Sequence, residues 1–231
     1  MTTAYRLHYA PDNASLIIRL ALLELEVPFE CALLDRETRA HKSAEYLALN
    51  PAGRIPALET PDGVMFETGA ILLWLADKHQ ALFPKADDPA RAHALKWLFY
   101  VSNTLHANLN LRFYPDQYTS EAHEALRAGA VENIKHAFSL LNDVAGEGHA
   151  WFNGPEVSIL DLYVAATLRW SQIYPSKDYR QITADAWPHL QQMVQRLETR
   201  ASVTELIKAE GLGQKPFSHP ENFYMYQSET A

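Results

Sequence analysis

Residues 50–77 read NPAGRIPALETPDGVMFETGAILLWLAD, and this stretch decides the fold. It begins with residues 50–53, whose Asn, Pro and Gly are typical of a loop. Residues 57–66 predict two short strands joined at Pro-Asp-Gly, which is a sequence that favours a hairpin turn. Glu67 and Thr68 then precede apolar residues at helical spacing. The predicted order is therefore loop, strand, turn, strand and helix.

Two features of this stretch suit the binding of a peptide. Pro56 lies at a loop-to-strand junction, where X–Pro bonds adopt the cis form most readily. A cis Ile55–Pro56 bond would turn the main-chain groups of Ile55 away from the sheet and leave them free to pair with a peptide-like ligand. Thr68 stands where a helix begins, and free N–H groups there favour a carboxylate. Glu67 beside it could hold an ammonium group.

The loop and strand around Pro56 and the helix start at Glu67 and Thr68 together resemble the glutathione-binding half of the cytosolic glutathione transferase family, which is a thioredoxin-like domain. The matching residues are Asn50-Pro51-x-Gly53-x-Ile55-Pro56-Ala57-Leu58 and, ten residues on, Glu67-Thr68-x-Ala70-Ile71. The resemblance covers nearly the whole chain. Its nearest classes are the bacterial beta and theta-like classes, although the first turn of this chain is atypical.

The fold class that follows is α/β plus all-α. The order strand, helix, strand, helix, hairpin, helix predicts a thioredoxin-like βαβαββα domain over residues 1–83. A linker with two prolines occupies residues 84–89, and an all-helical C-terminal domain is expected over residues 90–231. Ser158 and Asp161 form a capping-box pattern, so we assign Asp161 to helix structure and not to catalysis.

Composition narrows the classes of protein. The chain has 231 residues, 48% apolar and 21% charged, which is typical of a globular protein. A net charge of −8 argues against binding to nucleic acid or to an anionic membrane. We expect a cytoplasmic protein, because no apolar span and no signal peptide are evident. Cys31 is the single cysteine, and we expect it to be a buried, inert thiol. The scattered histidines predict no metal site.

The first turn is where the family places its catalytic hydroxyl or thiol, but this chain has neither tyrosine nor cysteine there. Aligned by Arg19, the usual serine or tyrosine position falls near Asp12, and the cysteine position falls at Ala14. Ser15 and Asn13 remain as candidate donors to the glutathione sulfur, with simple helix capping as the alternative. Asp12 would repel a thiolate, so we expect it to be a cap.

The resemblance implies two further groups of site residues. The candidates are His41, Lys42 and Arg54 for the glycine carboxylate of glutathione, and His106, Arg112 and Tyr114 for the electrophile. A solvated surface is the alternative for the basic residues. His106 aligns with a site histidine of beta-class members, whereas Ala107 stands where that class has lysine.

The leading hypothesis is an enzyme, a glutathione S-transferase that lowers the thiol pKa of its co-substrate and adds the thiolate to an apolar electrophile, as in detoxification. One alternative is a non-catalytic glutathione-binding or protein-interaction module on the same fold. Another is a different glutathione-dependent reaction, such as that of an isomerase or a lyase. A homodimer is also expected, because Phe66, Trp74 and the aromatic residues of 97–100 offer apolar surface.

Overall fold

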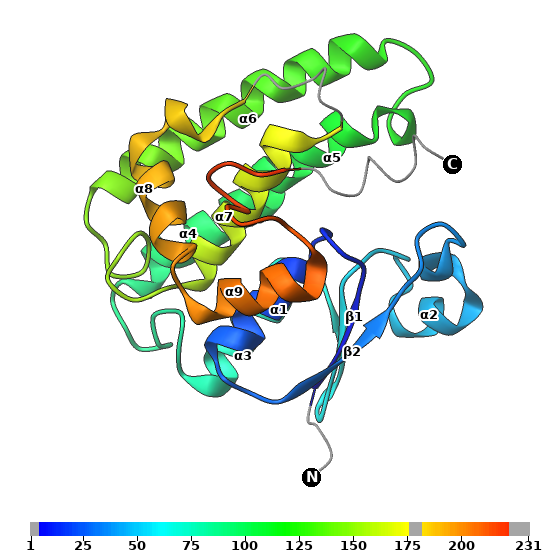
Figure 1. Cartoon of the computed structure of the whole chain (residues 1–231), viewed down its shortest axis with the longest axis horizontal. Helices are drawn as coiled ribbons and strands as arrows, with labels where there is room; N and C mark the ends of the chain where they lie inside the picture. The colour runs from blue at the N-terminus through cyan, green and yellow to red at the C-terminus, as the bar shows by residue number, and fades with distance from the viewer. Residues whose placement is uncertain (1–4, 176–181, 222–231) are drawn as a thin grey trace.

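The computed structural model describes residues 5–175 and 182–221, and its first domain is a four-stranded sheet covered on both faces by helices (Figure 1). Its elements are β1 (Tyr5–Tyr9), α1 (Ser15–Glu24), β2 (Phe29–Leu33), η1 (Ala40–Lys42), α2 (Ala44–Leu49), β3 (Ala57–Thr60), β4 (Gly63–Phe66) and α3 (Thr68–His79). α1 and α3 lie on one face of the sheet and α2 on the other. This is the predicted thioredoxin-like arrangement.

The sheet has the strand order β2-β1-β3-β4. β1 and β2 are parallel because α1 connects them, whereas β3 and β4 form the predicted antiparallel hairpin. Leu7 of β1 lies opposite Leu58 of β3, and both side chains are fully buried against the helices. Cys31 is exposed, because it lies on β2 at the edge of the sheet, so the expectation of a buried thiol is wrong.

The second domain is helical throughout the described residues. Its elements are α4 (Arg91–Tyr100), η2 (Val101–His106), α5 (Ala107–Phe113), η3 (Pro115–Gln117), α6 (His123–Gly146), α7 (Ile159–Ile173), η5 (Ala184–Ala186), α8 (Pro188–Leu197) and α9 (Ala201–Glu210). α7 is buried at every residue, because other helices and the first domain surround it.

The capping box at the start of α7 is present as predicted. The Ser158 hydroxyl accepts a hydrogen bond from the Asp161 N–H at 3.2 Å, and the Asp161 carboxylate accepts one from the Ser158 N–H at 2.8 Å. Asp161 also accepts the Asn153 N–H at 2.8 Å. These bonds satisfy main-chain groups that would otherwise be buried without partners, so Asp161 has a structural role.

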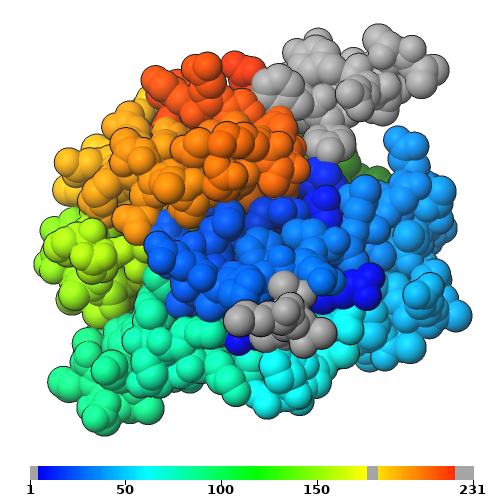
Figure 2. All heavy atoms as spheres, turned by 60° about the horizontal axis from the view of Figure 1, so that its bottom comes forward, coloured from blue at the N-terminus to red at the C-terminus, as the bar shows by residue number. Residues whose placement is uncertain are grey.

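The last helix of the chain returns to the first domain. Figure 2 shows the orange surface of α9 directly against the blue surface of α1. Two ion pairs cross this contact: Arg19 with Glu210 at 2.9 Å, and Arg200 with Glu24 at 2.7 Å. α1 is therefore covered by the sheet on one side and by helices of the second domain on the other, which explains why eight of its residues are buried.

η2 lies within the continuous helical stretch that runs from residue 91 to residue 113. It is one turn of π-helix between α4 and α5. Turns of this kind occur often at functional sites, because they change which side chains a helix presents on one face. Here Ser102 and His106 of η2 both line the cleft described below.

Candidate active site

A cleft of about 790 Å³ opens between the two domains. The first domain supplies one wall, from the first turn after β1, the loop before α2, the loop before β3 and the start of α3. The second domain supplies the facing wall, from η2, α5 and the C-terminal end of α7. Nearly all of the predicted site residues line this cleft: Asn13, His41, Lys42, Arg54, Ile55, Pro56, Glu67, Thr68, His106 and Tyr114. Ser15 and Arg112 do not.

The loop before β3 is held by two side chains. The Tyr46 hydroxyl and the Asn50 amide each donate a hydrogen bond of 2.7 Å to the Arg54 carbonyl. The Ile55–Pro56 bond that follows is cis, and β3 begins only at Ala57. Ile55 lines the cleft and precedes β3, so its main-chain groups lie outside the sheet. Tyr46 is not among the predicted site residues, and only its apolar spacing in α2 could have indicated that it is buried.

The basic wall of the cleft depends on one glycine. Gly53 has a φ of +58°, and a Cβ built there would lie 2.8 Å from the Lys42 Nζ. Glycine suits this turn because other residues rarely adopt a positive φ, and a side chain here would also displace the end of Lys42. His41 lies beside it, and burial together with nearby cations lowers its pKa. Among the residues that the structure describes, none accepts from or donates to the buried Nδ1 of His41.

The start of α3 combines a strained residue with free N–H groups. Glu67 has φ 71° and ψ 112°, a region that non-glycine residues rarely occupy, and its side chain is exposed. Its carbonyl accepts the first helical bond, from the Ile71 N–H at 2.9 Å. Thr68, which begins the helix, is 6% exposed. The positive end of α3 thus lies beside a carboxylate, an arrangement that suits a ligand with both charges.

The first turn differs from the prediction at Ser15. Its hydroxyl is completely buried and donates to the Ala10 carbonyl at 3.0 Å, so the prediction that Ser15 faces the glutathione sulfur is wrong. Asn13 does line the cleft, with its amide donating to the Pro11 carbonyl and accepting from Arg36. Within residues 5–175 and 182–221, no acceptor binds the N–H of Ala14, which also lines the cleft.

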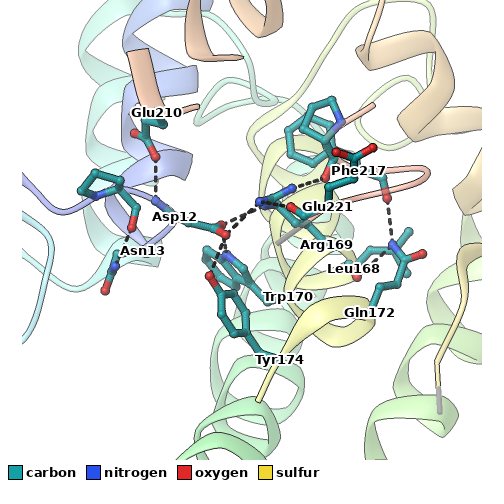
Figure 3. A network of polar contacts seen from close by, with 12 residues as sticks. Asp12, Asn13, Leu168, Arg169, Trp170, Gln172, Tyr174, Glu210, Phe217 and Glu221 are labelled. Atoms are coloured by element: carbon teal, nitrogen blue, oxygen red, sulfur yellow. Dashed lines mark hydrogen bonds and ion pairs between the residues drawn. The ribbon is translucent and has the colours of Figure 1, made fainter. Parts of the chain in front are cut away.

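Asp12 is not a helix cap. The N-cap of α1 is Ala14, and no side chain caps that helix. Figure 3 shows the Asp12 carboxylate turned toward α7, where it accepts hydrogen bonds from the Arg169 guanidinium at 2.8 and 2.9 Å, from the Trp170 indole at 2.9 Å and from the Tyr174 hydroxyl at 2.8 Å. The expectation failed because the partners of Asp12 belong to the other domain.

The wall from the second domain is aromatic and neutral. His106 Nδ1 lies 2.9 Å from the Tyr163 hydroxyl, and the two rings are perpendicular. Burial, with a smaller effect from the positive charge of Arg54, lowers the pKa of His106 to about 4, so the imidazole is uncharged near neutral pH. Phe113 packs edge-on against Tyr174, with ring centroids 5.8 Å apart. Trp170 and Tyr114 also line this wall.

Arg112 lies on the other side of α5. It is 1% exposed, and its guanidinium donates to the Ser171 carbonyl at 2.8 Å, so it joins α5 to α7. Burial lowers the pKa of Arg112 to about 10. The prediction that Arg112 meets the electrophile is wrong, because a helix presents residues on all of its faces and this face is turned to the core.

In the described part of the chain, no three His, Cys, Asp or Glu side chains gather in a way that could hold a metal ion. No helix there is both long enough and apolar enough to cross a membrane.

A thioredoxin-like sheet, a cleft lined by the loop before β3 and by the start of α3, and a helical second domain together define a two-domain protein of the thioredoxin-like class with an interdomain cleft. Residues 4–77 match the family model described as the N-terminal domain of glutathione S-transferase, and residues 124–200 match the C-terminal domain. The chain therefore belongs to the glutathione S-transferase family.

The chain is similar in sequence and structure to other members of this family over most of their length. Glutathione S-transferase GstB of Escherichia coli is 30% identical, with 82% of this chain and 90% of the relative covered. GstA of Escherichia coli O157:H7 is 28% identical, covering 90% and 99%. Among solved structures, a glutathione transferase homologue from Sulfitobacter with bound glutathione has a TM-score of 0.77 at 25% identity, covering 91% and 99%. A sphingomonad glutathione S-transferase complexed with glutathione has 0.73 at 28%, covering 90% and 100%.

Proposed function

We propose that this protein is a glutathione transferase that binds reduced glutathione along the first-domain wall of the cleft and adds its sulfur to an apolar electrophile. One observation carries the proposal: the free main chain of Ile55, the start of α3 with Glu67, and the first turn with Ala14 all line the same cleft. These are the groups needed for a peptide main chain, an α-amino acid and a thiolate.

The roles follow from the chemistry of each group. Ile55 pairs with the cysteinyl main chain of glutathione. Glu67 holds the ammonium of its γ-glutamyl end, and Thr68 with the N–H groups of α3 holds the carboxylate. Lys42, Arg54 and neutral His41 lie on the side that suits the glycine carboxylate. The thiol then meets the first turn, where the Ala14 N–H, the dipole of α1 and the Asn13 amide favour the thiolate.

The reaction needs one proton transfer and one new bond. The bound thiol gives its proton to solvent, and a sulfur lone pair forms the C–S bond with the electrophilic carbon. In a substitution, the leaving group departs with its bonding electrons. In an addition to a double bond, the displaced pair moves to the neighbouring carbon, which then takes a proton from water. The neutral wall of His106 and Tyr114 with its aromatic neighbours suits a flat, apolar electrophile.

We also propose a homodimer in the cytoplasm. Val64 and Phe66 on the edge strand β4 and Phe99 on α4 are exposed by 39%, 37% and 55%, and a second subunit would cover such side chains. The cytoplasmic location accords with the cytosolic family that the sequence resembles.

Two measurements on the purified protein test the function. Titration calorimetry with reduced glutathione should give a saturable binding heat, and a chlorodinitrobenzene should be conjugated with release of chloride. Binding without conjugation of any tested aromatic halide, enone or epoxide would favour the non-catalytic module instead. Absence of binding at millimolar glutathione would reject the proposed function.

A further inference from the structure

Asp12 is the most heavily bonded side chain of the first turn. All of its carboxylate donors come from α7 or the residue just after it: two from the Arg169 guanidinium, one from Trp170 and one from Tyr174 (Figure 3). The Asp12 side chain is 3% exposed and that of Arg169 is 1% exposed. A bidentate arginine pair shielded from water in this way fixes both the distance and the orientation of the groups it joins.

The main chain of Asp12 is fixed as well. Its N–H donates to the Glu210 carboxylate at 2.9 Å, and the other oxygen of Glu210 accepts from the Arg19 Nε at 2.9 Å. The φ of Asp12 is 51°, in the left-handed region. The turn is therefore held in an uncommon conformation by α7 through the side chain and by α9 through the backbone.

Arg169 connects Asp12 to the last described segment of the chain. Its guanidinium also donates to the carbonyls of Pro216 at 2.9 Å and Glu221 at 3.3 Å. Gln172, one turn along α7, donates to the Phe217 carbonyl at 2.8 Å. Three separate parts of the second domain thus hold this pair: α7 bonds the Asp12 carboxylate, α9 bonds the Asp12 main chain, and the last described segment bonds Arg169 (Figure 3).

The position of this carboxylate connects the two walls of the cleft. Asp12 lies two residues before Ala14, whose N–H is available to a sulfur. Its partners Trp170 and Tyr174 line the opposite wall, where the electrophile would lie. The separation between the thiolate and the electrophile therefore depends on the contact between Asp12 and α7.

We propose that Asp12 and Arg169 are positioning residues of the transferase reaction, which hold the thiolate-binding turn at a fixed distance from the aromatic wall of α7. This inference rests on the proposed function. Asp12 is not the base that takes the thiol proton, because both of its oxygens are occupied by donors from α7 and the chain just after it. The residues that hold the glutathione peptide, Ile55 and Glu67, make no contact with this pair, so peptide affinity should not depend on it.

Asp12→Asn is the most direct test. Asparagine tolerates a left-handed φ as well as aspartate does, so the backbone preference of the turn is kept. The change replaces one carboxylate oxygen by an NH₂ group that faces a donor of Arg169 and the donor of either Trp170 or Tyr174. Tyr174→Phe is the milder second variant, because it removes one donor and keeps the ring.

The chain provides a matched control. Glu24 on α1 accepts a bidentate pair from Arg200 at 2.7 and 2.7 Å, its side chain is 5% exposed, and the Ser202 hydroxyl adds a third bond. This pair also joins the two domains, but neither residue lines the cleft. Glu24→Gln therefore reproduces the loss of an interdomain ion pair with a buried carboxylate, without moving the first turn.

Four quantities are measured for the wild type and each variant: glutathione affinity by calorimetry, the pKa of the bound thiol by thiolate absorbance, and kcat and KM for a chlorodinitrobenzene. For Asp12→Asn we expect a thiol pKa raised by about one pH unit and a neutral-pH kcat lowered about tenfold, with recovery at higher pH and little change in glutathione affinity. Tyr174→Phe should move the thiol pKa in the same direction by less. Glu24→Gln should lower the melting temperature and leave the thiol pKa and kcat unchanged.

The outcomes separate this inference from the proposed function. Unchanged thiol pKa and kcat in a folded Asp12→Asn protein would overturn the positioning role, and so would equal losses in Asp12→Asn and Glu24→Gln. If Asp12→Asn does not fold, a wild-type thiol pKa in Tyr174→Phe overturns it instead. A wild type that binds glutathione but conjugates nothing would reject the transferase activity, while the thiol pKa values would still decide the inference. No binding by the wild type would reject both.

Discussion

The imidazole of His106 and the phenol of Tyr163 form a perpendicular pair, joined by a 2.9 Å hydrogen bond at Nδ1, that connects η2 to α7. The ring of Trp170 lies against the same imidazole, with centroids 5.7 Å apart. Because these rings displace water from around it, the pKa of His106 falls to about 4. The result is an uncharged polar group within an aromatic wall.

This low pKa makes stability depend on pH with a definite sign. The unfolded chain binds a proton at His106 below about pH 6.5, whereas the folded protein does not until about pH 4, so stability is lost as the pH falls between these values. From pH 7 to pH 5 the loss from this group is roughly 2 kcal/mol. Urea denaturation should show that His106→Gln lacks this part of the loss, whereas the exposed control His93→Gln keeps it.

Glu67→Ala should weaken glutathione binding by about tenfold or more, because a charge-assisted hydrogen bond to an ammonium contributes roughly 1.5–3 kcal/mol. The measurement is titration calorimetry at neutral pH. Glu205→Ala is the control, since Glu205 is an exposed α9 carboxylate paired with Lys208. Equal affinities for Glu67→Ala and the wild type would show that the start of α3 does not hold the γ-glutamyl end.

Ser15→Ala should reduce stability and leave the bound thiol unchanged. The lost bond to the Ala10 carbonyl is buried, so the free energy of unfolding should fall by about 1 kcal/mol. The thiolate absorbance titration should match that of the wild type, because the hydroxyl does not line the cleft. Asn13→Ala is the informative companion: a raised thiol pKa there identifies the amide as a donor, and an unchanged one assigns the effect to the main chain of α1. A raised thiol pKa in Ser15→Ala would refute this geometry.

The dimer proposal gives a prediction about mass. Light scattering at micromolar concentration should report twice the 26.1 kDa of one chain. Phe66→Glu on β4 should shift the mass toward one chain, because a buried charge without a partner is strongly unfavourable in an apolar interface. Tyr118→Glu, at a residue that is 50% exposed in the helical domain, is the control and should keep the larger mass. A wild-type protein with the mass of one chain would remove the proposal.

Much of the fold could be predicted because its signals are local. The stretch 50–77 contains the loop, the hairpin and the start of α3 in sequence order, and each depends on residues a few positions apart. The same holds for Ser158 and Asp161, whose capping box spans one helical turn. Turns and helix caps depend on residues that are close in the sequence, so these elements could be predicted without knowledge of the tertiary structure.

The first turn could not be predicted for the opposite reason. The donors to the Asp12 carboxylate lie 157 to 162 positions further along the chain, and nothing near Asp12 indicates that α7 will lie beside it. Ser15 and Arg112 were assigned to the site by residue type, but which helix face each occupies depends on where the other domain packs. η2 was missed because a π turn has no distinct residue pattern.

Two of the ion pairs across the domain contact, Arg169 with Asp12 and Arg200 with Glu24, have a consequence for protein engineering. A chimera that joins this first domain to the helical domain of a relative lacking these arginines would leave both carboxylates without their guanidinium partners, at a cost of up to about 3–5 kcal/mol for the buried pair of Asp12 and less for the more exposed pair of Glu24. Recombination at residues 84–89 should therefore yield less stable chains unless both arginines are carried over. Electrophile preference is better altered by substitutions within the aromatic wall than by exchanging the whole domain.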